Sequence, residues 1–127
     1  MQSGGATVAA GEHLQGRAAF LPFLSERLVG LIQPDLAMAG GLTRILEIAV
    51  LAEAFDIAVS PHFLPGLFVH LGAASSAVTW LEEFRLLEPL FEGWPELEKS
   101  GQLAPRDIPG HGISLSHSNR RRFAAAV

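Results

Sequence analysis

The stretch "LIQPDLAMAGGLTRILEIAVLAEAFDIAVSPHF", residues 31–63, decides the fold. Its first part, residues 31–34, indicates a short buried strand closed by a proline. Residues 57–60 are apolar on both faces, as in a strand of a buried parallel sheet. Between them, residues 42–55 predict a helix, because apolar side chains recur there at helical spacing: Leu42, Ile45, Leu46, Ala49 and Ala52. A strand, a helix and a strand in this order predict parallel strands joined by a right-handed crossover.

The same alternation extends to both sides of this unit. We expect further strands at residues 7–10 and 78–84, and further helices at residues 17–28 and 66–77. Repeated alternation of strands and helices is typical of an α/β fold with a parallel sheet. Prolines and glycines then dominate, so residues 85–113 are predicted to be mostly loop. No linker divides the chain, which is interpreted as one unit, residues 1–127, with strand–helix units in 1–84 and a tail in 85–127.

Composition excludes several classes of protein. Of the 127 residues, 49% are apolar and 17% charged, which suits one domain with a modest core and excludes wholesale disorder. The net charge of −4 and a pI of about 5.7 do not favour binding to nucleic acid or to an anionic membrane. The cluster Arg120–Arg122 is interpreted as a solvated tail, the alternative being a contact with phosphate or a partner. The absence of cysteine excludes disulfides and thiolate sites.

Nothing in the sequence predicts a membrane segment. The N-terminal residues "MQSGGATVAAGEH" lack the basic region and long apolar run of a signal peptide. The longest apolar stretch, residues 45–55, is interrupted by Glu47 and Glu53, and it is shorter than the roughly 20 residues that cross a bilayer. We therefore expect a cytoplasmic protein.

Each predicted strand ends at or beside an ionisable residue. These residues are Glu12, Asp35, His62 and Glu82, and successive ones lie about one strand–helix unit apart. In a barrel of parallel strands, such residues converge on one mouth, where active sites are built. In an open, doubly wound sheet they would lie along one edge. Four such groups are hard to explain by packing alone, since unpaired charges are costly to bury.

Four motifs that contain these residues resemble the catalytic barrel of the enolase superfamily. They are "AGEHLQG" (10–16), "IQPDLAMAGGLTRILEIAVLAEAF" (32–55), "VSPHF" (59–63) and "WLEEF" (80–84). The most similar branch is that of mandelate racemase, which includes the acid-sugar dehydratases. The segment "GQLAPRDIPGHGISL" (101–115) resembles the tail of those enzymes. The resemblance covers roughly residues 8–115 and implies a partial (β/α)8 TIM barrel, namely its last four strands with their helices and a loop-rich tail.

The resemblance also implies a role for each strand-end residue. Glu12 matches the last of three carboxylates that hold Mg²⁺, Asp35 and His62 match an Asp–His dyad, and Glu82 matches the acid on the final strand. The chemistry suits these roles, because magnesium prefers oxygen ligands and histidine can accept a proton near neutral pH. The reaction implied is removal of the proton next to the carboxylate of a small acid or acid sugar. Metal and protonated Glu82 would share the developing negative charge.

Structural interpretations of the same residues stay open. Glu12 could be a surface acid, Asp35 a helix N-cap alone, and His62 an ordinary loop histidine. Glu82 and Glu83 are neighbours that a strand would send to opposite faces, and Glu82 is chosen on the "WLE" match. The other histidines, His13, His70, His111 and His117, show no convincing partner pattern.

The sequence also lacks much of what the resemblance implies. A TIM barrel needs about 250 residues, and no room precedes Glu12 for the other metal carboxylates, a lysine-bearing strand and a capping domain. We therefore expect a chain that is inactive alone, that needs the N-terminal part of the barrel or another chain, and that forms homo-oligomers. One alternative is a non-catalytic half-barrel that self-associates through its open edges. Another is a small metal-free enzyme that uses Asp35 and His62, although "GxSxG" is absent. Dehydration is favoured over racemisation, because racemisation needs a second base on the opposite face.

Overall fold

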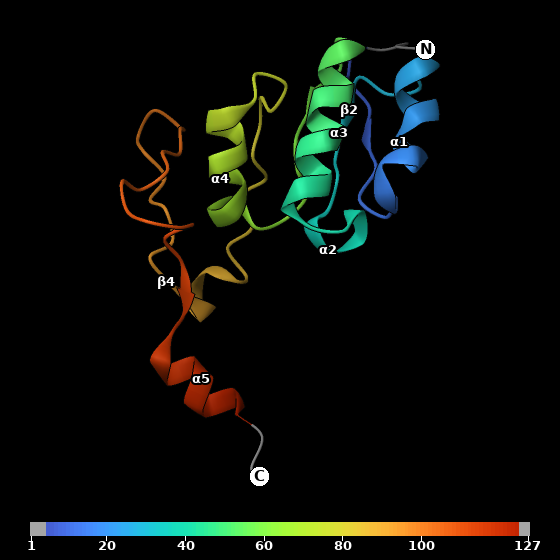
Figure 1. Cartoon of the computed structure of the whole chain (residues 1–127). Helices are drawn as coiled ribbons and strands as arrows, with labels where there is room; N and C mark the ends of the chain where they lie inside the picture. The colour runs from blue at the N-terminus through green and yellow to red at the C-terminus, as the bar shows by residue number, and fades with distance from the viewer. Residues whose placement is uncertain (1–4, 125–127) are drawn as a thin grey trace.

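The computed structural model describes residues 5–124 and contains a parallel sheet covered by helices (Figure 1). The strands are β1 (Ala9–Ala10), β2 (Leu31–Ile32) and β3 (Ala58–Val59), in the order β1-β2-β3. Leu31 pairs with Ala9 on one side and with Ala58 on the other. The three strands are those predicted from the sequence, and they are shorter than predicted.

Four helices connect and follow these strands. They are α1 (Gly16–Ser25), α2 (Leu36–Ala39), α3 (Leu42–Ala54) and α4 (Pro65–Ala74). The predicted helices α1, α3 and α4 are confirmed, whereas the short α2 was not predicted. Gly40 at φ 100° and Gly41 at φ 96° turn the chain between α2 and α3, in a backbone conformation that favours glycine.

The predicted strand at residues 78–84 is wrong over most of its length. Only Val78 forms a parallel bridge, with Val59 of β3. The Val59 amide donates to the Ala77 carbonyl at 2.8 Å, and the Thr79 amide donates to the Val59 carbonyl at 3.1 Å. From there the chain leaves the sheet, and Trp80 is 70% exposed. The fold is thus a partial TIM-type α/β barrel, whose sheet has three strands, β1 to β3, and a fourth strand position marked by a single bridge in the described residues.

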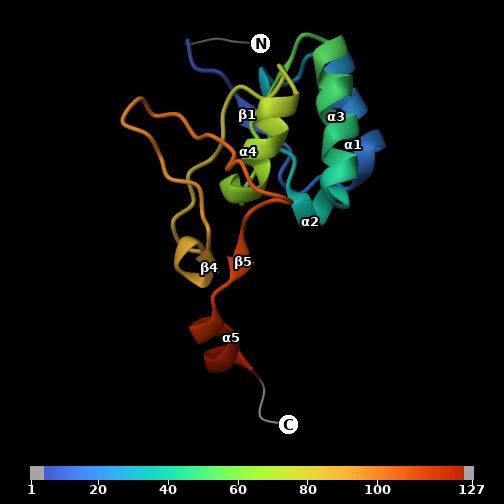
Figure 2. The same cartoon turned by 60° about the vertical axis from the view of Figure 1, so that its left-hand side comes forward.

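The core lies between the sheet and the helices. Helices α1 and α3 run side by side in both ribbon views (Figures 1 and 2). Fully buried apolar side chains come from α1, α3, α4 and the strands: Phe20, Leu24, Ile32, Ile45, Ile48, Ala49, Val59 and Phe68. Burial of such side chains is the main favourable contribution to folding. It holds the sheet, and with it the ends of the strands, in a fixed place.

The tail packs on α4 and then leaves the body. It contains the 3₁₀ turn η1 (Glu88–Leu90), the antiparallel pair β4 (Phe91–Glu92) and β5 (Ser114–Leu115), and helix α5 (His117–Phe123). Gly66 of α4 lets the Trp94 indole approach closely, since a Cβ at that position would lie 3.0 Å from the ring. The loop predicted for most of residues 85–113 is confirmed. Within residues 5–124, every helix is too short or too polar to cross a bilayer.

Candidate functional site

The backbone ladder of the sheet brings the predicted site residues to one edge. The His62 amide donates to the Pro34 carbonyl at 3.0 Å, which places Asp35 and His62 opposite each other in a parallel bridge. Glu12 lies just beyond β1, after Gly11, whose neighbour in the ladder is Gln33. All three therefore lie at the carboxyl ends of neighbouring parallel strands, where ligands bind in α/β folds.

One nitrogen of the His62 ring lies near two carboxylates. This nitrogen, Nδ1, is 2.8 Å from Glu82 Oε2 and 3.8 Å from Glu12 Oε2. The His62 side chain is 25% exposed and that of Glu82 33%, so the pair sits in a half-buried position. Nδ1 itself is shielded from solvent and makes no hydrogen bond of good geometry, because it does not point along the short line to Glu82. A carboxylate this close to Nδ1 attracts the His62 ring when the ring is protonated.

A strained turn after His62 holds Glu82. Phe63 and Leu64 have φ values of 66° and 46°, a left-handed conformation that non-glycine residues rarely adopt. The turn points the Phe63 amide at Glu82 Oε2, to which it donates at 2.8 Å. The Phe63 ring also packs against Phe84, with ring centroids 4.1 Å apart. Strain of this kind costs on the order of 1–3 kcal/mol per residue and clusters at functional sites.

The Asp35 carboxylate caps a helix, one of the two roles that the sequence left open. Its Oδ1 accepts hydrogen bonds from the amides of Ala37 at 2.8 Å and Met38 at 3.0 Å, and so caps α2. Among the described residues, no hydrogen bond joins this carboxylate to the His62 ring. The structure thus brings Asp35 and His62 together through the backbone, while Glu82 supplies the carboxylate that lies 2.8 Å from His62 Nδ1.

Glu82 and Glu83 point to different surroundings. Glu83 Oε1 accepts from Arg85 Nε at 2.7 Å, and both side chains are more than half exposed. This hydrogen bond raises the pKa of the Arg85 guanidinium above its usual value. Of the two neighbouring acids, Glu82 is therefore the one placed at the strand-end cluster.

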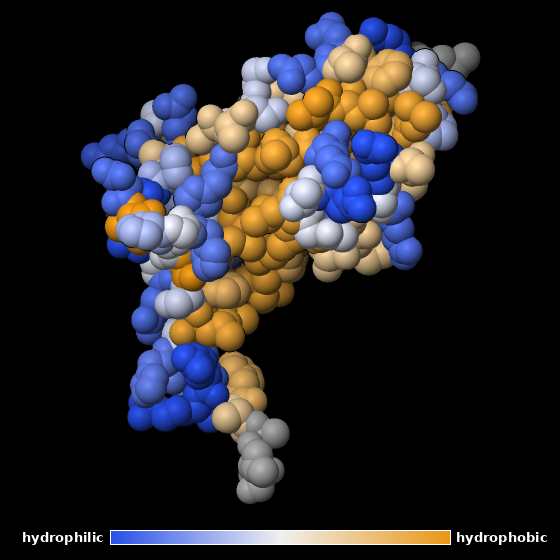
Figure 3. All heavy atoms as spheres, viewed as in Figure 1, coloured by the Kyte–Doolittle hydropathy of each residue, from blue (hydrophilic) through white to orange (hydrophobic). Residues whose placement is uncertain are grey.

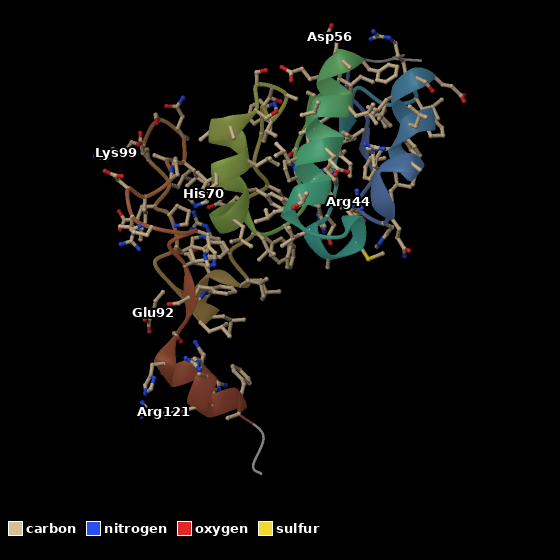
Figure 4. The ribbon with its side chains drawn as sticks, in the orientation of Figure 1. Arg44, Asp56, His70, Glu92, Lys99 and Arg121 are labelled. Atoms are coloured by element: carbon tan, nitrogen blue, oxygen red, sulfur yellow. The ribbon has the colours of Figure 1, made fainter. Side chains whose placement is uncertain are left out.

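Sequence reasoning missed two neighbours of this cluster. His13 Nε2 lies 3.4 Å from Glu12 Oε1, although the His13 side chain is 85% exposed. Phe63 contributes its amide, which every residue except proline carries, so that no sequence signal could have identified it. His70 on α4 faces the tail instead, and its Nε2 lies 3.1 Å from the His111 carbonyl (Figure 4).

The cluster does not by itself form a metal site. Within residues 5–124, no three histidine, aspartate or glutamate side chains are arranged to hold an ion. Magnesium takes up to six oxygen ligands in a near-octahedral arrangement. Glu12 offers one carboxylate, and its ionisable neighbours here are the imidazoles of His13 and His62, which are poor ligands for Mg²⁺.

Comparisons with known proteins agree with this architecture. In sequence, the chain is 46% identical over 125 residues to the D-galactonate dehydratase of Ralstonia nicotianae, with 87% of this chain and 33% of that protein covered. It is 38% identical over 90 residues to the L-talarate/galactarate dehydratase of Salmonella typhimurium, with 71% and 22% covered. In structure, it matches L-talarate dehydratase from Polaromonas sp. JS666, complexed with Mg and L-glucarate, at a TM-score of 0.83 and 35% identity, with 92% and 32% covered.

The chain thus spans about a fifth to a third of the length of these relatives. A sequence model of the family described as "Enolase C-terminal domain-like" matches residues 2–119, nearly the whole chain. The fold, the parallel strand ends and this match lead to one conclusion. The chain belongs to the enolase C-terminal domain-like family.

Proposed function

We propose that this chain supplies the C-terminal part of an acid-sugar dehydratase active site. The observation that carries the proposal is the position of His62, whose Nδ1 lies near the carboxylates of both Glu82 and Glu12 at the carboxyl ends of parallel strands. The named relatives support it, because they are dehydratases of acid sugars. They also make the alternative of a non-catalytic half-barrel less favoured.

In the proposed reaction, His62 removes the proton next to the substrate carboxylate. Since Nδ1 is shielded from solvent and is the ring nitrogen near Glu82, we assign Nε2 to the substrate. The C–H bond breaks and its proton moves to His62, and the electron pair forms a C=C bond as the neighbouring C–O bond breaks. His62 then returns the proton to the departing hydroxyl, which leaves as water. One group thus acts first as base and then as acid, and the enol product converts to a 2-keto-3-deoxy acid.

The surrounding residues hold this histidine and take up charge. Glu82 lies at 2.8 Å from Nδ1 and attracts the imidazolium that forms after proton transfer. The Phe63 amide fixes the Glu82 carboxylate, so little rearrangement is needed during the reaction. The role of Glu82 as a hydrogen-bond donor to the substrate, and that of Asp35 as the partner of the His62 ring, remain predictions.

Magnesium enters the proposal only as an ion of the complete enzyme. We propose Glu12 as one of its carboxylate ligands, with the other ligands outside this chain, since the described residues do not form the site alone. The ion would stabilise negative charge on the substrate carboxylate. No step assigned to His62 above depends on it.

The test is a chimaera. Residues 5–124 replace the matching segment of the Ralstonia nicotianae D-galactonate dehydratase, and formation of 2-keto-3-deoxy acid from D-galactonate is measured with Mg²⁺ present. We expect turnover by the chimaera, at most traces from the isolated chain, and a loss of roughly 10²-fold or more in His62→Gln. His70→Gln is the matched control, because the His70 ring lies 3.1 Å from the His111 carbonyl in the tail.

Three results would count against the proposal. One is a folded chimaera, assembled like the relative, that forms no product. Another is a His62→Gln chimaera as active as its parent. The third is inversion at the carbon next to the carboxylate without loss of water, which would indicate a racemase.

A further inference from the structure

The segment that carries Glu82 is held only weakly by its backbone. The sheet ladder ends where the Thr79 amide donates to the Val59 carbonyl at 3.1 Å. Over residues 80–86, no backbone hydrogen bond joins this segment to the rest of the described chain. The Glu82 carboxylate nevertheless lies 2.8 Å from His62 Nδ1. Its place therefore depends on contacts of side chains.

One oxygen of Glu82 serves two neighbours. Oε2 accepts the hydrogen bond of the Phe63 amide at 2.8 Å, and the same atom lies 2.8 Å from His62 Nδ1. The amide reaches Oε2 from a turn in which Phe63 and Leu64 have φ values of 66° and 46°. Residues other than glycine keep such a conformation only where their surroundings hold it. Whatever holds this turn thus also holds the carboxylate beside His62.

Phe84 makes a contact that can hold the turn. Its ring packs on the Phe63 ring, with centroids 4.1 Å apart and the ring planes tilted by 45°. Glu82 and Phe84, two residues apart, therefore both contact Phe63, one at its amide and the other at its ring. Hydrophobic residues crowd the surface around the N-terminal end of α4, which follows this turn (Figure 3). Aromatic rings that pack in such surroundings stabilise the backbone that carries them.

We propose that Phe84 is a positioning residue for the reaction at His62. Its ring keeps Phe63 in the left-handed turn, and the Phe63 amide then keeps Glu82 in place. Without the ring, the imidazolium formed at His62 loses a fixed carboxylate, so proton transfer slows while substrate binding is retained. This role rests on the proposed function. The contacts themselves lie wholly within this chain and do not depend on what covers its open edge.

The first test follows the Phe63 amide in the full 127-residue chain by hydrogen exchange, measured with NMR. We expect this amide to be protected, and to exchange roughly tenfold faster or more in Phe84→Ala, because local opening of the turn exposes it to water. The Val59 amide, which donates to the Ala77 carbonyl at 2.8 Å, reports on the sheet. Its exchange should change by less than about twofold.

Three further variants test whether the ring contact is the cause. Phe84→Tyr keeps the ring and should keep the Phe63 amide protected. In F63A/F84A, the amide at position 63 should exchange no faster than in Phe63→Ala alone, because the ring pair is already broken. Phe91→Ala is the matched control, since Phe91 stacks on Trp94 in the tail, with centroids 5.5 Å apart. It should leave the Phe63 amide unchanged.

The second test measures kcat and KM for D-galactonate in the dehydratase chimaera. Phe84→Ala should lower kcat by roughly tenfold or more and change KM by less than about threefold, as expected when only the reacting state loses a contact. Phe84→Tyr and Phe91→Ala should both stay close to the unsubstituted chimaera.

The two tests separate this inference from the proposed function. An unsubstituted chimaera that forms no product would contradict the proposed function and with it the role in catalysis, and the exchange rates would still decide whether Phe84 holds the turn. In an active chimaera that needs His62, an unchanged kcat in Phe84→Ala would overturn the positioning role alone. A Phe63 amide that exchanges as in an unfolded peptide, or an equal acceleration at the Val59 amide, would also overturn it.

Discussion

At the scale of single residues, Asp35 shows how one carboxylate can serve the fold beside a reactive group. It accepts from the amides of Ala37 and Met38, so Asp35→Ala should destabilise the chain by about 1 kcal/mol, a typical cost of losing an N-cap. Asp35→Asn should retain most of that stability, because its amide oxygen can cap as well. Urea unfolding of both variants measures the difference. Equal destabilisation by the two substitutions would show that the charge of Asp35 matters beyond the cap.

The residues at the strand ends could be predicted, but not their pairing. The positions of Asp35 and His62 could be predicted, because each residue follows an apolar run that is closed by a proline. Which carboxylate faces the His62 ring depends on side-chain rotamers and on the left-handed turn at Phe63 and Leu64. That turn is adopted by residues that do not favour it, so it is held by its surroundings and leaves no mark in the sequence.

At the scale of elements, α3 is apolar on more than the face it buries. Ile48 is fully buried and Val50, on the other side of the helix, is 57% exposed. Ile48→Ala should therefore cost about 2–4 kcal/mol through lost burial and a residual cavity. Val50→Ala should change the stability by less than about 0.5 kcal/mol. Thermal and urea unfolding of the two variants provide the comparison, and a similar loss in both would mean that α3 packs differently.

The helical spacing of apolar residues predicted α3 correctly, because the pattern that defines such a helix lies within its own sequence. It did not identify which apolar residues stay exposed: Leu42, Leu46 and Val50 follow one another at intervals of about one turn and are all exposed. The failed strand at residues 78–84 has a similar cause. A strand is completed by its neighbours, and in the described residues Val78 has a partner only in β3. Local sequence cannot report that the second neighbour is missing.

At the scale of the whole molecule, the edge of the sheet at Val78 leads to a prediction about tryptophan fluorescence. Trp80 is 70% exposed beside the last bridge of the sheet, whereas Trp94 packs on Gly66 and stacks with Phe91 at 5.5 Å. Trp94→Phe leaves Trp80 as the only indole, and its fluorescence should be red-shifted and readily quenched by acrylamide. Trp80→Phe leaves Trp94, whose emission should be blue-shifted and several times less quenched, because its ring is covered by the tail and α4.

The chimaera used to test the reaction extends this prediction. If protein outside this chain continues the sheet beyond Val78, the indole of Trp80 should become shielded when residues 5–124 are placed within the longer relative. In the Trp94→Phe form of the chimaera, with any tryptophan of the relative replaced by phenylalanine, the fluorescence should then be quenched less than in the same variant of the isolated chain. Equal acrylamide quenching of Trp80 in the chimaera and in the isolated chain would mean that this edge stays open in the complete protein. The cluster around His62 would then lie beside an open sheet edge that water can reach. Water there would weaken the electrostatic contacts that the proposed reaction needs.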